Sequence, residues 1–242
     1  MTPALLNTDS LAWLRDQPDG AFDLCLTDPP YDERTHAGAR TNKRRVDPFV
    51  NEIDFAPMCP AVFVPDLLRV TRRWVVCFCT SEMLAEYRDA AGDAYVRGGV
   101  WHKTNATPQI TGDRPGQAAE AFAIMHRRGE GRSHWHGGGL PAFVSGASGL
   151  HDKQAEGLTH PTVKPRYLMR TLLKWFADPG DHVLDPFMGS GTTGVVCAER
   201  GHPFTGIEIN PKYYAEAVAR ISGVTAQPGL TLTPKPRQPR LA

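Results

Sequence analysis

A carboxylate, two prolines and a tyrosine, Asp28-Pro29-Pro30-Tyr31, follow the first apolar run of the chain, residues 22–27. The amino group of a nucleic-acid base is a poor nucleophile because its lone pair is delocalised into the ring. The Asp28 carboxylate and the Pro29 carbonyl can accept both N–H groups, which favours a pyramidal nitrogen and stabilises the positive charge that develops on it. Tyr31 offers a ring on which a flipped-out base can stack. The alternative is a surface turn capped by Asp28.

A glycine-rich turn, residues 185–194 (Asp-Pro-Phe-Met-Gly-Ser-Gly-Thr-Thr-Gly), joins a predicted strand to a predicted helix. Glycines let the backbone approach a ligand closely, and the helix that follows presents free N–H groups. Glu208 ends the next predicted strand, where a carboxylate can accept hydrogen bonds from both hydroxyls of a ribose. Because the turn has no lysine, a nucleoside-triphosphate loop is disfavoured. The short motif favours S-adenosylmethionine (SAM) over NAD, and a purely structural turn is the alternative.

The apolar periodicity predicts the elements that must position these residues. Strands are expected at 22–27, 74–79, 95–103, 119–126, 182–186 and 204–209, and helices at 61–72, 81–91, 165–177, 192–200 and 211–221. Strands that alternate with helices predict an α/β fold with a doubly wound, mostly parallel sheet of the Rossmann-like type. Ligands bind such sheets at the carboxyl ends of the strands, which is where Asp28, the glycine turn and Glu208 fall.

The remaining chain suggests one domain with loops and a tail. Residues 32–55 and 129–158 have no apolar period and are predicted loops of a single domain that spans residues 1–223. Residues 224–242 contain several prolines and no acidic residue, which predicts a disordered basic tail.

Composition limits the class of protein. A net charge of +1 over 242 residues means that any nucleic-acid surface has to be local. Four of the five cysteines lie in apolar stretches and are expected to be free thiols. The chain has no apolar run long enough for a membrane span and its start does not resemble a signal peptide, so we expect a soluble cytoplasmic protein. His134 and His136 lack further ligands nearby, and no metal site is predicted.

Taken together, the motifs resemble the β group of DNA amino-methyltransferases, a permuted family in which the catalytic motif precedes the cofactor motif. The resemblance rests on Thr27 to Tyr31, on Trp101-His102-Lys103-Thr104-Asn105, on His160-Pro161-Thr162-Val163-Lys164-Pro165, on the glycine turn, and on residues 206–211 (Gly-Ile-Glu-Ile-Asn-Pro). It extends over residues 5–221. The implied fold is that of SAM-dependent methyltransferases, and the implied catalytic residues are Asp28, Pro29, Pro30 and Tyr31.

The resemblance also implies a set of SAM contacts. They are Asp9, Lys164, Asp185, Phe187, Gly189, Ser190, Gly191, Thr192 and Glu208. Within this set, Glu208 is expected to hold the ribose, and Lys164 and Thr192 to lie near the methionine end. Asp9 matches a family contact to the adenine amino group of SAM, but the glycine that precedes it in the family is absent here, where Thr8 stands.

The implied reaction is methylation of N6 of adenine or N4 of cytosine within a specific sequence of double-stranded DNA. Aspartate at the first motif position favours adenine, because serine is commoner in the cytosine enzymes. Methylation of cytosine C5 needs a nucleophilic thiolate from a Pro-Cys pair, whereas this chain has Cys59-Pro60. A catalytically silent SAM- or DNA-binding subunit and an RNA methyltransferase are further alternatives. A homodimer and a partner restriction endonuclease are compatible with the family.

A basic cluster follows the catalytic motif. It consists of Arg34, Arg40, Lys43, Arg44 and Arg45, with no acidic residue between 34 and 46. Such a cluster can grip DNA phosphates around a flipped nucleotide, and Lys103 of the 101–105 segment is expected to add to this surface. The alternative is a solvated charged loop.

Overall fold

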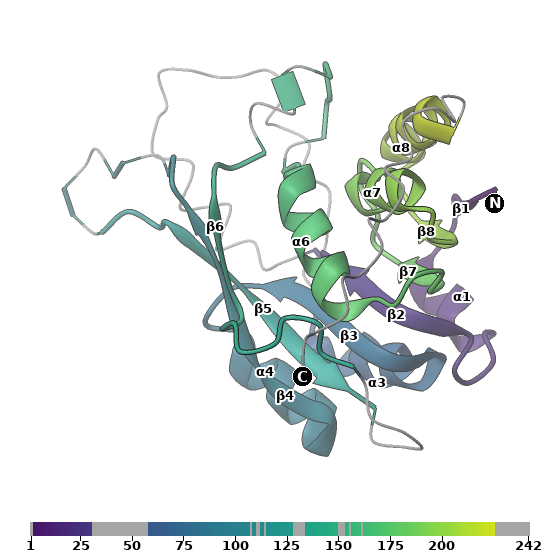
Figure 1. Cartoon of the computed structure of the whole chain (residues 1–242), viewed down its shortest axis with the longest axis horizontal. Coiled ribbons are helices and arrows are strands. Elements are labelled where there is room, and N and C mark those ends of the chain that lie inside the picture. Colours follow the sequence, from purple (N-terminus) through teal and green to yellow (C-terminus); the bar gives the residue numbers. More distant parts are fainter. Residues whose placement is uncertain are drawn as a thin grey trace, which may run out of the picture.

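The computed structural model describes residues 2–30, 58–106, 108–109, 112–113, 115–127, 134–149, 153–154, 156–160 and 162–225. One eight-stranded sheet runs through them, with the strand order β1-β8-β7-β2-β3-β5-β4-β6 (Figure 1). The strands are β1 (Ala4–Leu6), β2 (Phe22–Thr27), β3 (Thr71–Cys79), β4 (Tyr95–Lys103), β5 (Ala119–His126), β6 (Phe143–Gly146), β7 (Val183–Asp185) and β8 (Phe204–Ile207). Over the described residues, no helix has the length and apolar character that crossing a membrane requires.

The sheet is mostly parallel, as predicted. Strands β1, β8, β7, β2 and β3 pair in parallel in that order, and β4 pairs in parallel with β6. Only β5, among the strands described, is antiparallel to its neighbours, β3 and β4. Because β4 and β5 are consecutive and antiparallel, this side of the sheet is built from a hairpin rather than from a helical crossover.

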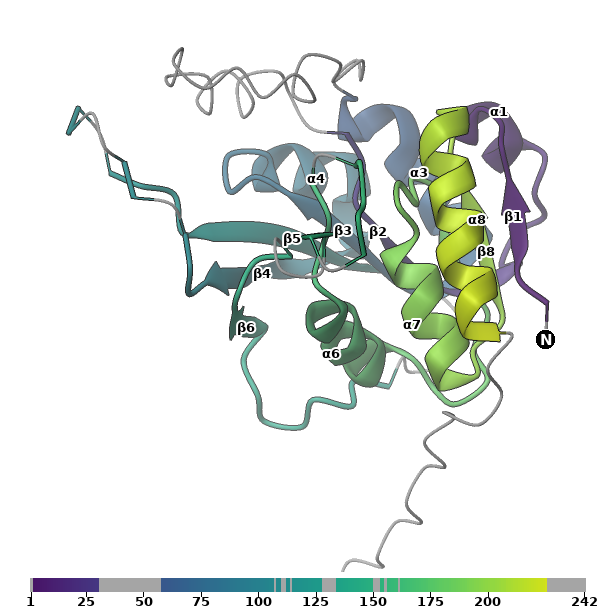
Figure 2. The same cartoon turned by 90° about the horizontal axis from the view of Figure 1, so that it is seen from above.

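Helices cover both faces of the sheet (Figure 2). One face carries α1 (Ser10–Arg15), α3 (Pro60–Val70) and α4 (Leu84–Ala91), which is followed by the short 3-10 helix η2 (Gly92–Ala94); the other carries α6 (Arg166–Phe176), α7 (Thr192–Arg200) and α8 (Pro211–Thr225). In β3, the side chain of Val75 packs on the face that carries α1, α3 and α4, and that of Val76 packs on the face that carries α6, α7 and α8. Since side chains alternate and both faces are covered, the central strands are apolar almost throughout.

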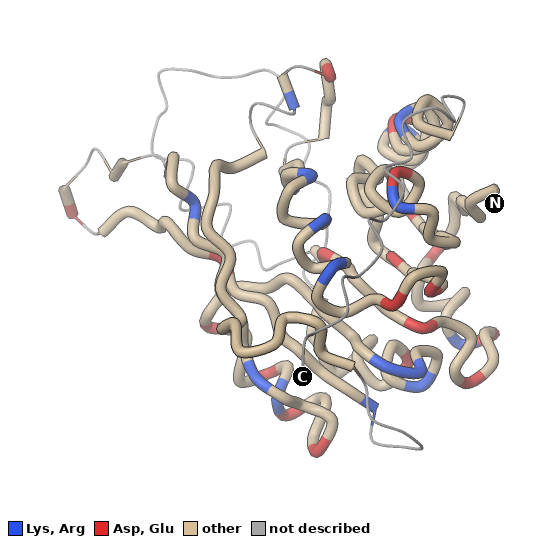
Figure 3. The backbone as a smooth tube through the Cα atoms, in the orientation of Figure 1, with Lys and Arg blue, Asp and Glu red and all other residues tan. Residues whose placement is uncertain are grey.

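Basic side chains on helix α6 form ion pairs with the neighbouring helix α7. Arg166, Arg170 and Lys174 are spaced four residues apart along one side of α6 (Figure 3). Two of them pair with Glu199 of α7: Arg166 Nη1 lies 3.1 Å from Glu199 Oε1, and Arg170 Nη2 lies 2.7 Å from Glu199 Oε2.

The predicted free thiols are present, with Cys25, Cys77, Cys79 and Cys197 buried and Cys59 exposed.

Three short elements were not predicted. The expected loop 129–158 contains strand β6, so that prediction was wrong at this position; only Val144 of its four residues is buried, which leaves almost no apolar pattern. β1 has three residues. α1 has six and is capped by the preceding residue, Asp9, whose carboxylate accepts a 2.7 Å hydrogen bond from the Ala12 N–H. Elements this short carry little periodicity. Helix α8 extends to Thr225, past residue 223, and residues 226–242 lie outside the described part.

The connections diverge between β2 and β7. From β2 the chain passes through α3 to β3, whereas from β7 it passes through α7 to β8, on the opposite face and in the opposite direction along the sheet. The carboxyl ends of β2 and β7 therefore lie at a topological switch point, which is where open α/β sheets bind ligands.

Candidate active site

Asp28 lies directly after β2, where its carboxylate meets a buried lysine. Lys164 Nζ lies 2.5 Å from Asp28 Oδ2 and 3.3 Å from Glu120 Oε2, and it stands 4.9 Å from the centre of the Phe78 ring. The Lys164 side chain is 8% exposed and that of Asp28 is 23% exposed. Burial lowers the pKa of Lys164, but the charges of Asp28 and Glu120 outweigh burial and raise it. Lys164 is therefore a buried cation, held beside two carboxylates.

Lys103, predicted to contact DNA, is also paired. It ends β4, its ammonium donates to Glu120 Oε1, and it lies 5.1 Å from the centre of the Trp101 ring. A role in DNA binding stays a prediction for Lys103. Glu120 itself was missed, although the sequence held a signal: it is the only acidic residue of strand β5, which is otherwise almost entirely apolar.

The glycine turn follows β7 and depends on its two central glycines. Gly189 and Gly191 have φ angles of 49° and 79°, which side chains rarely tolerate. A Cβ atom on Gly189 would lie 2.9 Å from His160 Nε2, and one on Gly191 would lie 2.8 Å from Ala217 Cβ. Gly191 precedes the first turn of α7, which no side chain caps. An uncapped helix start of this kind suits a ligand with hydrogen-bond acceptors.

Glu208 follows β8 and faces this turn. Its Oε2 accepts the Gly189 N–H at 3.0 Å and its Oε1 accepts the Asn210 N–H at 2.8 Å. Burial raises the pKa of Glu208, and these backbone hydrogen bonds oppose the rise. Each carboxylate oxygen can accept more than one hydrogen bond, so the group retains capacity for the hydroxyls of a ligand.

Asp9 lies near Glu208 in the fold but has another partner. The Asn7 amide donates to the carbonyls of Glu208 and Ile209 at 2.7 and 3.1 Å, which brings the segment 7–9 beside the end of β8. Asp9 is exposed and caps α1. The placement is compatible with the predicted SAM contact, and the capping bond gives Asp9 a structural role in addition.

Asp185 ties the two halves of the site together. Its Oδ1 accepts the Thr27 hydroxyl at 2.7 Å and the Phe187 N–H at 3.2 Å, so the end of β7 is bonded to the residue that precedes Asp28. The Phe187 ring packs edge-on against Phe63, at 5.6 Å between centroids. Asp185 is buried, which raises its pKa to about 7 despite these hydrogen bonds. Asp185 therefore stabilises the glycine turn as a buried hydrogen-bond acceptor.

This buried carboxyl predicts a pH effect on stability. Its folded pKa of about 7 lies above its ordinary value of 3.8, so the folded protein binds the proton more tightly and the unfolding free energy should fall as the pH rises from about 4 to about 7. Asp185→Asn imitates the protonated form and should remove this dependence. Denaturant unfolding of both proteins at about pH 5 and about pH 8 measures it. Equal pH dependence in the two proteins would contradict the assignment.

Ser190 and Thr192 are held from the side of α8. Arg220 Nη1 lies 2.5 Å from the Ser190 carbonyl oxygen and 3.2 Å from Thr192 Oγ1, and Arg220 Nε donates to Glu156 at 2.9 Å. The Arg220 side chain is almost completely buried. Sequence reasoning missed it because an arginine in an amphipathic helix is typical of an exposed face.

Six predicted site residues lie outside the described part of the chain. They are Tyr31 and the basic cluster Arg34, Arg40, Lys43, Arg44 and Arg45. The described residues on either side of 31–57 meet beside the catalytic motif, where the Met58 N–H lies 3.5 Å from the Pro30 carbonyl oxygen. Pro29 is buried and Pro30 half-buried.

Comparison with known sequences gives one family and several relatives. Residues 143–219 match N6_N4_Mtase, a DNA methylase family. The chain is 37% identical over 131 residues to the type II methyltransferase M.XycI of Xanthomonas campestris pv. cyanopsidis. It is 34% identical over 130 residues to the type II methyltransferase M.Cfr9I of Citrobacter freundii. Each match covers 51% of this chain and 43% of the relative, so less than half the length of these curated relatives is matched.

Solved structures match over most of the chain. The M1.HpyAVI–SAM complex has a TM-score of 0.65 at 23% identity, covering 90% of this chain and 100% of the other. The cytosine-N4-specific PvuII DNA methyltransferase has a TM-score of 0.68 at 16% identity, covering 94% and 92%. Residues 143–219 contain Lys164, the glycine turn and Glu208, and this segment is similar in sequence to DNA methylases. The chain as a whole has the mixed α/β fold of SAM-dependent methyltransferases.

Proposed function

We propose that this chain is a site-specific DNA methyltransferase that transfers the methyl group of SAM to an exocyclic amino group of a base in double-stranded DNA, with N6 of adenine as the target. The observation that carries the proposal is the position of Asp28. Its partly exposed carboxylate lies at the end of β2, bonded to Lys164 and joined through Thr27 and Asp185 to the glycine turn of the neighbouring strand. A hydrogen-bond acceptor is thus placed beside a turn suited to a nucleoside ligand.

The residues of the glycine turn fit SAM. A nucleoside and an amino-acid group have to approach the backbone at this turn. The two glycines have positive φ angles and pack closely against His160 and Ala217, so they give the turn the conformation in which its backbone N–H groups would meet the ligand. Glu208 would hold the ribose hydroxyls, and the backbone of Phe187 to Thr192 would line the rest of the ligand. When bound, SAM supplies a methyl group on a positively charged sulfur, which makes that methyl group electrophilic.

Asp28 and Pro29 then act on the amino group of the base. The Asp28 carboxylate accepts one N–H and the Pro29 carbonyl accepts the other, which directs the nitrogen lone pair out of the ring plane. The same two oxygens stabilise the positive charge that develops on the nitrogen. Lys164 supports this step as the cation that pairs with the second oxygen of Asp28, and no metal or covalent enzyme intermediate is needed.

The base has to leave the duplex to reach Asp28. Tyr31 would stack against it, and the basic cluster after the motif would hold the flanking phosphates. Both assignments are proposals, as are a homodimer and a partner restriction endonuclease. The second of these is suggested by relatives that are named type II methyltransferases.

A second candidate is the same reaction at N4 of cytosine. The aspartate at the first position of the motif favours adenine. The likeness to the PvuII enzyme, which is cytosine-N4-specific and has a TM-score of 0.68, favours cytosine. The hydrogen-bond pattern proposed for Asp28 and Pro29 serves either amino group.

Product analysis tests the proposal. The chain is incubated with methyl-labelled SAM and unmethylated genomic DNA of mixed sequence, and the DNA is digested to nucleosides. Label in N6-methyladenine supports the proposal, and label in N4-methylcytosine shifts it to the second candidate. Absence of label from both nucleosides would overturn the proposed enzyme and favour a SAM- or DNA-binding subunit.

A further inference from the structure

Glu120 links two lysines on the sheet face that α6 covers. Its Oε1 accepts the Lys103 ammonium and its Oε2 lies 3.3 Å from Lys164 Nζ, which in turn lies 2.5 Å from Asp28 Oδ2. Charges therefore alternate from Lys103 through Glu120 and Lys164 to Asp28. Of these four side chains, only Lys164 is almost completely buried.

The sheet register fixes Glu120 at this place. Glu120 is paired with Trp101 across the β4–β5 ladder, and the Lys103 N–H donates to the Ala118 carbonyl at 2.7 Å. Trp101 and Phe122 lie in the core beneath α6, so Glu120 points to the same face. Both partners of the Lys103–Glu120 pair thus stand on neighbouring strands of a rigid sheet.

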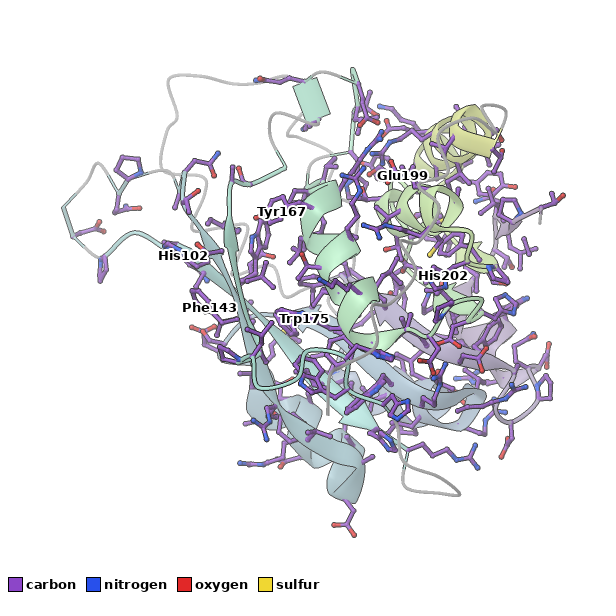
Figure 4. The ribbon with its side chains drawn as sticks, in the orientation of Figure 1. His102, Phe143, Tyr167, Trp175, Glu199 and His202 are labelled. Atoms are coloured by element: carbon purple, nitrogen blue, oxygen red, sulfur yellow. The ribbon has the colours of Figure 1, made fainter. Side chains whose placement is uncertain are left out.

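Helix α6 brings Lys164 to this face. Trp101 Nε1 donates to the hydroxyl of Tyr167 at 2.7 Å, which fastens the first turn of α6 to β4. Figure 4 shows Tyr167 on the side of α6 that faces the sheet strands β4 and β6. Lys164 lies two residues before α6 begins at Arg166, so the same fastening sets its main chain. Its long side chain still needs a second anchor to fix the ammonium.

We infer that Glu120 is a positioning residue of the methyl-transfer site, which anchors the Lys164 ammonium so that Asp28 can accept the amino group of the base. The inference rests on the proposed function. Without Glu120, the ammonium would pair more closely with Asp28 and would compete with the incoming amino group for the carboxylate oxygens. With Glu120, the ammonium is shared between two carboxylates, so Asp28 can give up part of that interaction to the incoming amino group.

Because Glu120 and Lys164 carry opposite charges, the pKa of Lys164 depends on Glu120, and a change of pH can test their pairing. In the described part of the chain, the titratable groups next to Lys164 include Asp28, Glu120 and the imidazole of His160, and the charges of Asp28 and Glu120 raise the pKa of Lys164. The two lysines lower the pKa of Glu120 in spite of its burial, so Glu120 is an anion at neutral pH. Loss of that anion should let Lys164 lose its proton at a lower pH.

The test compares Glu120→Gln and Glu120→Asp with a matched control, Glu82→Gln, whose carboxylate is exposed. Glu120→Gln should lower kcat about 10- to 100-fold with little change in KM for SAM or DNA, and the alkaline limb of its pH–rate profile should move to lower pH. Glu120→Asp, which keeps the charge, should recover most of the rate. A purely structural role would not move the pH profile or separate kcat from KM.

A second measurement does not depend on activity. The pKa of Lys164 is followed by NMR of its labelled side chain, and it should be lower in Glu120→Gln than in the unchanged protein. An unaltered Lys164 pKa, or an unaltered alkaline limb, would overturn the role of Glu120. Absence of methyl transfer by the unchanged chain would instead overturn the proposed function, so the two failures can be told apart.

Discussion

Replacing Asp28 with alanine is expected to lower the rate of methyl transfer by about 10³-fold while SAM affinity changes little. In the proposed reaction the carboxylate accepts an N–H group of the base and stabilises charge at the transition state, and alanine can do neither. The cofactor turn should survive, since it is held by Asp185, Glu208 and the packing around Gly191 rather than by Asp28. Single-turnover transfer and calorimetric SAM binding measure the two effects.

The isosteric variant Asp28→Asn separates charge from shape. It retains one oxygen acceptor but no negative charge, so we expect a rate between those of the unchanged protein and Asp28→Ala. Asp89→Asn is a matched control, because its carboxylate on α4 is 72% exposed and lies outside the site. Normal transfer by Asp28→Ala would remove Asp28 from the chemistry. Loss of SAM binding in both Asp28 variants would indicate a disturbed fold instead.

The sequence predicted long elements well and short ones poorly. The predicted bounds of β2, β5 and α7 agree with the structure, because strands buried on two faces and helices with a glycine boundary leave clear patterns. The bounds of β4 agree as well, although only Gly99 and Trp101 of its nine residues are buried. Edge strands β1 and β6 bury few side chains and gave no such pattern. The antiparallel direction of β5 was not predicted either, since direction depends on the connection and not on the residues of the strand.

The site was predictable where it lies at the ends of strands. Asp28, the glycine turn and Glu208 follow neighbouring parallel strands, so the topology alone brings them to one edge of the sheet. Glu120 was not found because its partners come from strand register and from the residues before α6. The sequence also did not predict that the Asp185 side chain is buried and bonded to Thr27, since this hydrogen bond joins strands that lie far apart in the sequence.

Lys164→Met should lower the unfolding free energy by about 3–5 kcal/mol as well as slow methyl transfer. The substitution keeps the volume of the side chain but leaves the carboxylates of Asp28 and Glu120 without their shared cation in a mostly buried place. Denaturant unfolding at neutral pH measures the loss of stability. Lys174→Met, on the exposed side of the same helix region, is the matched control and should change stability by less than about 0.5 kcal/mol.

The electrostatic origin of the Lys164→Met effect can be separated from lost packing. Lys164 lowers the pKa of Glu120. Without the lysine, the pKa of Glu120 should rise in the folded state, so this carboxyl takes up a proton as the pH falls and the loss of stability should shrink towards acid pH. Lys103 still balances Glu120 in part, but Glu120→Gln removes the interaction of Glu120 with Lys164, so the double variant should lose less stability than the sum of the two single losses. A loss that is constant with pH, and additive with Glu120→Gln, would mean that Lys164 stabilises the fold by packing against Phe78 rather than by charge.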